Sequence, residues 1–154
     1  MTSHHFAPAL GYRWLTPAYG AAIAVLTRGR GWRQALIRPM APRAKQIVAD
    51  VGCGAGTLAV MLKAHAPSVS VYGFDPDPDI LNRAEHKAHN AGALVNFTHA
   101  TMDDIAAKLT ALSPDYIVSS LVFHQVPLAG KRKLLAAMYA GLRPGGQLHI
   151  ADYG

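Results

Sequence analysis

The feature that most constrains this chain is a glycine-rich turn after a short apolar run. Residues 48–57 read Val-Ala-Asp-Val-Gly-Cys-Gly-Ala-Gly-Thr, so an apolar strand pattern enters three alternating glycines and then a helical pattern. Glycine allows positive φ and lets a ligand approach the backbone closely, and the free amides at a helix start favour an anionic group. The turn predicts a ligand-binding strand–loop–helix unit, with a tight connection that binds nothing as the alternative.

The spacing within this turn separates two classes of ligand. A dinucleotide site is expected to read G-x-G-x-x-G, but here Thr57 stands at the third glycine position and Gly56 comes one residue early. Asp50 precedes the first glycine, where its charge would repel a pyrophosphate and attract an ammonium group. The loop therefore favours an amino-acid ligand, with its ammonium near Asp50 and its carboxylate near the amides. An NAD-dependent dehydrogenase is the disfavoured alternative.

A second acidic residue ends the next apolar run. Asp75 follows the run 69–74 and lies about 20 residues after the glycine loop, where an acid can accept hydrogen bonds from both ribose hydroxyls. A helix N-cap is the alternative role, but Asp77 or Asp79 is better placed for it. We therefore expect Asp75 to bind ribose.

Strand and helix patterns alternate along the chain. Strands are expected at 46–51, 69–74, 94–98, 116–120 and 147–151, and helices at 57–66, 78–90, 103–112 and 128–142, the last burying Leu134, Leu135, Met138 and Leu142. Two short helices are expected, 17–27 and, after a glycine-containing break at 28–31, one ending near Arg38. They precede a linker bracketed by Pro39 and Pro42. This order predicts an α/β protein with a doubly wound, mainly parallel sheet. We expect residues 1–42 to form a helical cap segment and residues 43–154 the α/β core.

Four motifs in this order resemble class I S-adenosylmethionine (SAM)-dependent methyltransferases, especially the branch of ubiquinone and menaquinone biosynthesis. The segments VADVGCGAG, YGFDPDPDILNRA, DYIVSSLVFHQVP and LRPGGQLHIADYG are similar to the first, second, fourth-strand and fifth-strand motifs, and the resemblance covers about residues 46–154. It implies a Rossmann-like core that transfers a methyl group from SAM to a small, lipophilic acceptor and releases S-adenosyl-L-homocysteine. A non-catalytic module that binds SAM or this product and acts through a partner is the alternative.

The resemblance also implies roles for individual residues. Asp50, Gly52, Cys53 and Gly54 would hold the amino-acid end of SAM, Asp75 the ribose, Pro76 the adenine face, and Ser119 the underside of the methionine part. Thr101 and Met102 stand at the adenine edge, where the family carries an acid; the Met102 amide or the Asp103 carboxylate would replace it. His124 would face the substrate as a base, with a structural loop histidine as the alternative. Tyr12, Trp14 and Tyr19 precede the core; Tyr19 is a candidate lid residue, with packing of the helices onto the sheet as the alternative role for all three.

The charge of the chain is unevenly distributed. The formal net charge is +6, yet no acidic residue precedes Asp50. Seven basic residues lie in that stretch: Arg13, Arg28, Arg30, Arg33, Arg38, Arg43 and Lys45. They are typical of a solvated basic face, with an anionic membrane surface as a partner as the alternative. Nucleic acid is not expected, because aromatic side chains do not interleave with the basic ones, and the scattered histidines predict no metal site.

The remaining expectations concern location and assembly. A single cysteine, no apolar run near the ~20 residues that span a bilayer and no signal-peptide pattern favour the cytoplasm. The resembled fold continues beyond its fifth strand, where this chain ends. Strand five is therefore expected to be an exposed edge that a homo-oligomer would cover. A fragment of a longer protein, an edge covered by a partner and a natural short form are the competing explanations.

Overall fold

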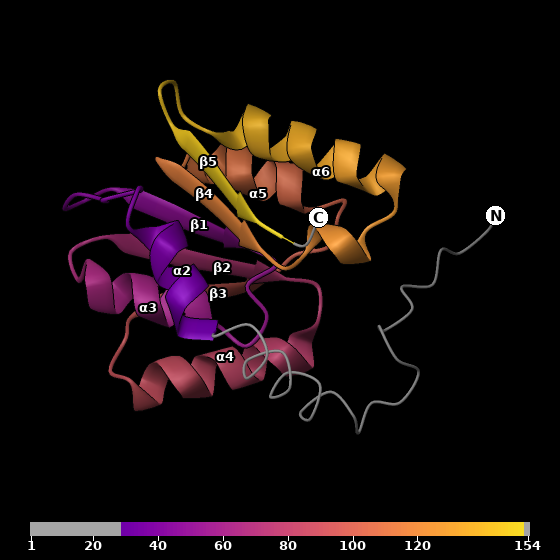
Figure 1. Ribbon diagram of the computed structural model, residues 1–154. Helices are drawn as coiled ribbons and strands as arrows, with labels where there is room; N and C mark the ends of the chain where they lie inside the picture. Colours follow the sequence, from indigo (N-terminus) through magenta and orange to yellow (C-terminus); the bar gives the residue numbers. More distant parts are fainter. Residues whose placement is uncertain (1–28, 153–154) are drawn as a thin grey trace. The chain divides into compact units, whose positions relative to one another are not determined.

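The computed structural model describes residues 29–152 of the chain (Figure 1). In chain order the elements are α2 (Gly29–Ile37), β1 (Ile47–Val51), α3 (Thr57–His65), β2 (Ser70–Asp75), α4 (Pro78–Asn90), β3 (Val95–His99), α5 (Ile105–Leu112), β4 (Tyr116–Ser120), the short 3₁₀ helix η2 (Phe123–Gln125), α6 (Leu128–Gly141) and β5 (Gln147–Ala151). The chain divides into two compact units at residues 35 and 36. The fold described below is that of the second unit.

The sheet of the second unit is entirely parallel within the described residues. Its strand order is β3-β2-β1-β4-β5, and β1 pairs with both β2 and β4. From β1 the chain proceeds outward to β2 and β3 on one side of the sheet and then to β4 and β5 on the other. The sheet is therefore doubly wound, and its switch point lies between β1 and β4. The predicted fold class is confirmed. Open sheets of this kind bind ligands at the carboxyl ends of their strands.

Helices cover both faces of this sheet (Figure 1). α3 contacts α4 and β2 on one face, and α5 packs against α6 on the other. Strand β1 is buried on both faces, which explains why its sequence is a continuous apolar run interrupted only by Asp50. The core under α5 and α6 is made by Ala49, Val51, Phe74, Ala100, Ile105, Leu109, Ile117, Phe123, Leu134, Ala137 and Met138.

Some local predictions were wrong or fall outside the described residues. α2 begins at Gly29, so the glycines at 29 and 31 lie in its first turns rather than before it. Leu135 is 38% exposed and not part of the core, while Leu134 and Met138 are buried as predicted. The helix at 17–27 and the aromatic residues before it lie outside the described part of the chain, and the cap segment stays a prediction. No helix of residues 29–152 is long and apolar enough to span a membrane.

Candidate functional site at the carboxyl ends of the strands

The three glycines of the loop after β1 have different surroundings. All three have positive φ: 74° at Gly52, 51° at Gly54 and 73° at Gly56. A Cβ atom on Gly52 would lie 2.3 Å from Val122 Cγ2, and one on Gly56 would lie 2.9 Å from Ala84 Cβ. A Cβ atom on Gly54 would meet nothing within 4 Å. The outer two glycines therefore permit close packing, whereas Gly54 faces open space that a ligand could enter.

Asp75 joins this loop to the end of β2. Its Oδ2 accepts a hydrogen bond from the Gly54 amide at 2.9 Å, and its Oδ1 accepts one from the Asp77 amide at 3.0 Å. Burial raises the pKa of Asp75, while these two amide hydrogen bonds oppose that rise. The N-cap of α4 is Asp77, one of the two predicted candidates, and its Oδ1 accepts from the Asp79 and Ile80 amides. Asp75 is thus not the cap of that helix.

The region under the loop is acidic and buried. The Asp50 carboxyl group is completely buried, and Cys53 is 8% exposed. Burial, and then the negative charges of Asp50 and Asp75, raise the pKa of the Cys53 thiol well above its usual range. The thiol therefore stays neutral, and the negative charge at this place belongs to the two carboxylates. Negative charge of this kind favours a cationic group in a ligand.

Most loop amides already have partners inside the protein. The Gly52 and Cys53 amides both donate to the Phe74 carbonyl oxygen, at 2.8 and 3.0 Å, and the Gly56 amide donates to the Cys53 carbonyl oxygen at 3.0 Å. A ligand carboxylate would therefore accept hydrogen bonds from backbone amides at the start of α3 rather than from the amides of Gly52 or Cys53. Gly56 caps α3 without a side-chain hydrogen bond.

Ser119 and Pro76 occupy supporting positions. The buried Ser119 hydroxyl donates to the Val51 carbonyl oxygen at 2.9 Å, which ties β4 to β1 directly below the glycine loop. The Pro76 carbonyl oxygen lies 3.0 Å from His99 Nε2 at the end of β3. His99 pairs with Asp75 in the strand register, and its charge is one of the influences that lower the pKa of Asp75. Sequence reasoning missed His99.

The segment expected at the adenine edge starts α5. The Thr101 hydroxyl donates to Asp104 Oδ2 at 2.7 Å, and this hydrogen bond is the main cause of the lowered pKa of Asp104. Asp103 forms an exposed ion pair with Lys133 on α6, so its carboxylate has a partner other than the adenine position. Met102 packs partly buried against the core. The described contacts of Thr101 are those of a helix-start residue.

His124 lies in η2, at the carboxyl end of β4. Its Nδ1 is 2.7 Å from Asp152 Oδ1, and Asp152 directly follows β5. Sequence reasoning missed Asp152. Because the parallel strands β4 and β5 end at the same edge of the sheet, the residues that follow them, His124 and Asp152, were candidates for a contact. The Val122 side chain packs against Gly52, so the segment that holds His124 borders the glycine loop.

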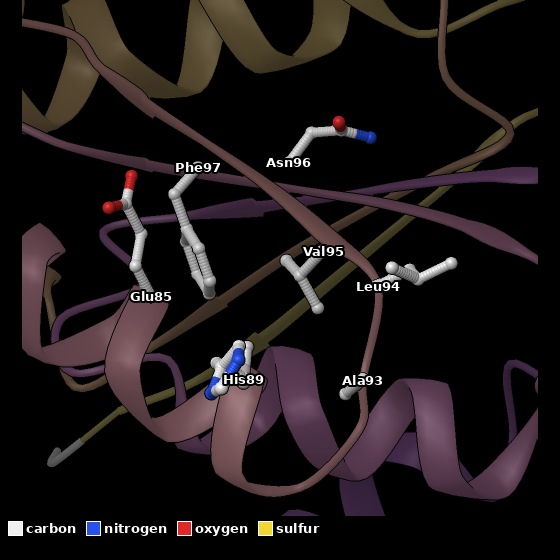
Figure 2. A pocket seen from close by; sticks show the side chains of 8 residues that line it. Glu85, His89, Ala93, Leu94, Val95, Asn96 and Phe97 are labelled. Atoms are coloured by element: carbon white, nitrogen blue, oxygen red, sulfur yellow. The ribbon is translucent and has the colours of Figure 1, made fainter.

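One hollow of the described structure is lined by other residues. It has a volume of about 350 Å³ and lies between α4 and the first half of β3 (Figure 2). Its lining residues are Glu85, Ala88, His89, Ala93, Leu94, Val95, Asn96 and Phe97, and none of them was a predicted site residue. Within residues 29–152, no group of three or more His, Cys, Asp or Glu side chains is arranged to hold a metal ion.

Comparison with known proteins assigns the family. The sequence profile of the family described as "Methyltransferase domain" matches residues 48–146, which include the glycine loop, Asp75 and His124. The chain belongs to the methyltransferase domain family. A curated relative, the demethylmenaquinone methyltransferase of Thermus thermophilus, is 30% identical over 141 residues, which are 90% of this chain and 62% of the relative. The chain thus spans less than two thirds of that methyltransferase.

Solved structures of other proteins share the fold. A Pyrococcus horikoshii protein has a TM-score of 0.70 at 18% identity, with 82% of this chain and 57% of that one covered. The Haemonchus contortus phosphoethanolamine N-methyltransferase 2, solved with S-adenosyl-L-methionine, has a TM-score of 0.65 at 23% identity, with 80% and 28% covered. At these identities the likeness shows the Rossmann-like fold of the family.

Proposed function

We propose that this chain binds SAM over the glycine loop and promotes transfer of its methyl group to a small-molecule acceptor. The observation that carries the proposal is the pairing of Asp75 with the open Gly54 at the carboxyl ends of β2 and β1, beside the switch point of the sheet. A half-buried acid and an open glycine at this edge are two features that suit a nucleoside with an amino-acid tail.

The residues present fit that ligand. Each Asp75 carboxylate oxygen accepts one amide hydrogen bond and retains a second lone pair, so the group has capacity for two ribose hydroxyls. The negative charge of Asp50 would favour the ligand's ammonium group across the loop. Pro76 would lie against adenine, with Met102 at its edge, and Ser119 would hold the β1 end in place beneath the methionine part.

SAM, when bound, supplies a methyl group on a positively charged sulfur, which is a good leaving group. The chain then has to orient the acceptor in line with that methyl group, and positioning of this kind supplies much of the rate. His124 is our candidate base, because it lies at the same strand edge and its side chain is 25% exposed. It would accept the proton that the acceptor loses.

We further infer a lipophilic acceptor of the quinol type. The support is the similarity to a demethylmenaquinone methyltransferase over 90% of this chain. A short-chain demethylmenaquinone, reduced before use, is the appropriate probe, and phosphoethanolamine is the charged comparison acceptor. We expect methylated quinol and S-adenosyl-L-homocysteine in equal amounts from the first probe. Product only from phosphoethanolamine would overturn this choice of acceptor.

Calorimetric titration of the full chain with SAM, S-adenosyl-L-homocysteine and NAD tests the cofactor site. We expect binding of the first two and none of NAD. Gly54→Ala should abolish binding, because its methyl group would occupy the open side of the loop. Gly92→Ala is the matched control: Gly92 also has positive φ, at 62°, and a Cβ there also meets nothing within 4 Å. Equal binding by both variants, or preferential binding of NAD, would refute the proposed site.

An anionic membrane as partner would suit a lipophilic acceptor, and its support is the basic stretch before Asp50. Much of that stretch precedes the described residues. Sedimentation with anionic and neutral vesicles, at low and high salt, tests it. We expect salt-sensitive pelleting with anionic vesicles alone. Equal pelleting with both kinds of vesicle, or no pelleting, would remove the membrane from the proposal.

A further inference from the structure

The imidazole of His124 is held by a carboxylate from another strand. His124 Nδ1 lies 2.7 Å from Asp152 Oδ1, and the Asp152 side chain is 11% exposed, so the contact is largely shielded from water. An ionised carboxylate only accepts hydrogen bonds. Nδ1 must therefore carry a proton in this contact.

The other ring nitrogen has a donor beside it. The side-chain amide nitrogen of Gln125 lies 3.3 Å from His124 Nε2. An amide NH₂ group only donates, so its neighbour must be an acceptor. Both contacts therefore specify the same neutral tautomer, in which Nδ1 is protonated and Nε2 carries the lone pair.

The backbone also fixes Asp152 relative to His124. The second carboxylate oxygen, Oδ2, accepts from the amides of Phe123 and His124, the first two residues of η2. β4 and β5 pair up to Ser120 and Ala151, and the Leu121 amide then donates to the Ala151 carbonyl oxygen at 2.9 Å. One carboxylate thus holds both the short helix and the ring that the helix carries.

We propose that Asp152 is a positioning residue that presents His124 to the methyl acceptor with Nε2 as the proton-accepting atom. Gln125 holds this lone pair until the acceptor's hydroxyl group replaces its amide. In the methyl transfer, a ring carbon of the quinol forms the new bond to the methyl carbon, the sulfur–carbon bond breaks with its electron pair retained on sulfur, and the quinol hydroxyl proton moves to Nε2. Return of the ring-carbon proton to the oxygen then restores the aromatic quinol. The product histidine is a cation beside the Asp152 carboxylate, which stabilises it. This inference rests on the proposed function.

The first test needs neither cofactor nor acceptor. The ¹⁵N shifts of the histidine rings report which nitrogen is protonated, and the chain has eight histidines. His124→Phe identifies the signals of His124 by their loss. We expect the Nδ1-protonated tautomer in the unmodified chain near neutral pH. A predominant Nε2-protonated tautomer would overturn the proposal, whatever the fate of any variant.

The second test compares variants of two acidic residues. In Asp152→Asn the new amide group would donate to Nδ1, so the ring signals should shift to the Nε2-protonated tautomer. We expect methylation of the demethylmenaquinone probe to fall by about 10²- to 10⁴-fold, with SAM affinity within about threefold of the unmodified chain. Glu85→Gln, which alters an exposed acid on α4, should change neither signal nor rate. An unchanged tautomer and an unchanged rate in Asp152→Asn would refute the role of Asp152. Failure of the unmodified chain to bind SAM would instead refute the proposed function.

Discussion

Carboxylates lie at both ends of the parallel strands, and their partners differ. At the amino ends, Asp115 accepts from the Ile47 amide at 2.7 Å and from the Gln46 side chain at 3.2 Å. It also pairs with Arg143 Nε at 2.6 Å. Asp115 precedes β4, Ile47 begins β1 and Arg143 precedes β5, so this one side chain links the starts of three strands.

At the carboxyl ends, Asp75 accepts only backbone amides among its described hydrogen bonds, and it lies beside the open Gly54. No cation shares an ion pair with it in the described residues. A carboxylate with a cation and side-chain partners stabilises the fold, whereas one held by amides beside an open glycine keeps capacity for a ligand. The comparison teaches that the partners of an acid, and not its burial alone, separate structural from binding roles.

The largest effect is expected from Asp75→Asn. Two hydrogen bonds from ribose hydroxyls to a charged acceptor contribute about 1.5–3 kcal/mol each, so the affinity for SAM should fall by at least about 100-fold. The free energy of unfolding should change by about 1 kcal/mol or less, because the variant loses one amide hydrogen bond but no longer buries a charge. Calorimetry and urea unfolding measure the two quantities. A large loss of stability with unchanged affinity would place Asp75 with Asp115 as a structural acid.

The converse result is expected for Asp115→Ala. The variant leaves the Ile47 amide without its acceptor and removes a cross-strand ion pair, which should lower the free energy of unfolding by about 2–3 kcal/mol. SAM affinity should be unchanged in the folded fraction. Asp103→Ala is the control, because its ion pair with Lys133 is exposed and should contribute less than about 1 kcal/mol. Equal destabilisation by the two substitutions would contradict the structural role of Asp115.

A smaller effect is expected at a glycine of the amino-end region. A Cβ atom on Gly146 would lie 3.0 Å from the carbonyl oxygens of both Arg143 and Asp115. Gly146→Ala should therefore lower the free energy of unfolding by about 1–2 kcal/mol through overpacking against backbone, without loss of SAM binding. Gly145→Ala is the neighbouring control. A Cβ atom there meets nothing within 4 Å, so this variant tests the strain of a φ of 78° without overpacking. Loss of SAM binding in Gly146→Ala would show that the amino-end region reaches the cofactor site.

The same division explains what the sequence could predict. The β-strands, α3 to α6 and the Asp77 cap follow from local periodicity and turn residues, so they were predicted to within a few residues. The glycine loop and Asp75 were chosen from their spacing along one βαβ unit. The His124–Asp152 contact joins residues 28 positions apart, and the contacts of Asp115 with Gln46 and Ile47 join residues 69 and 68 positions apart. Such pairs depend on which strands become neighbours, so local patterns gave no sign of them.

The smallest effect expected is a pH dependence in which stability and SAM affinity change in opposite directions. The pKa of Asp75 is raised above 3.8, chiefly by burial, so the folded chain binds this proton more tightly than the unfolded chain does. On acidification through the folded-state pKa, protonation of Asp75 should add stability to the free protein. Binding of ribose hydroxyls favours the ionised form, so SAM affinity should fall over the same range and begin to fall at higher pH than for an ordinary aspartate. Paired titrations and urea unfolding from neutral pH down to about pH 4, near the ordinary pKa of 3.8, measure both trends, with Asp75→Asn as the variant that should lose them. Affinity and stability that fall together in the unmodified chain, and equally in the variant, would assign the pH dependence to other groups and leave Asp75 ionised throughout.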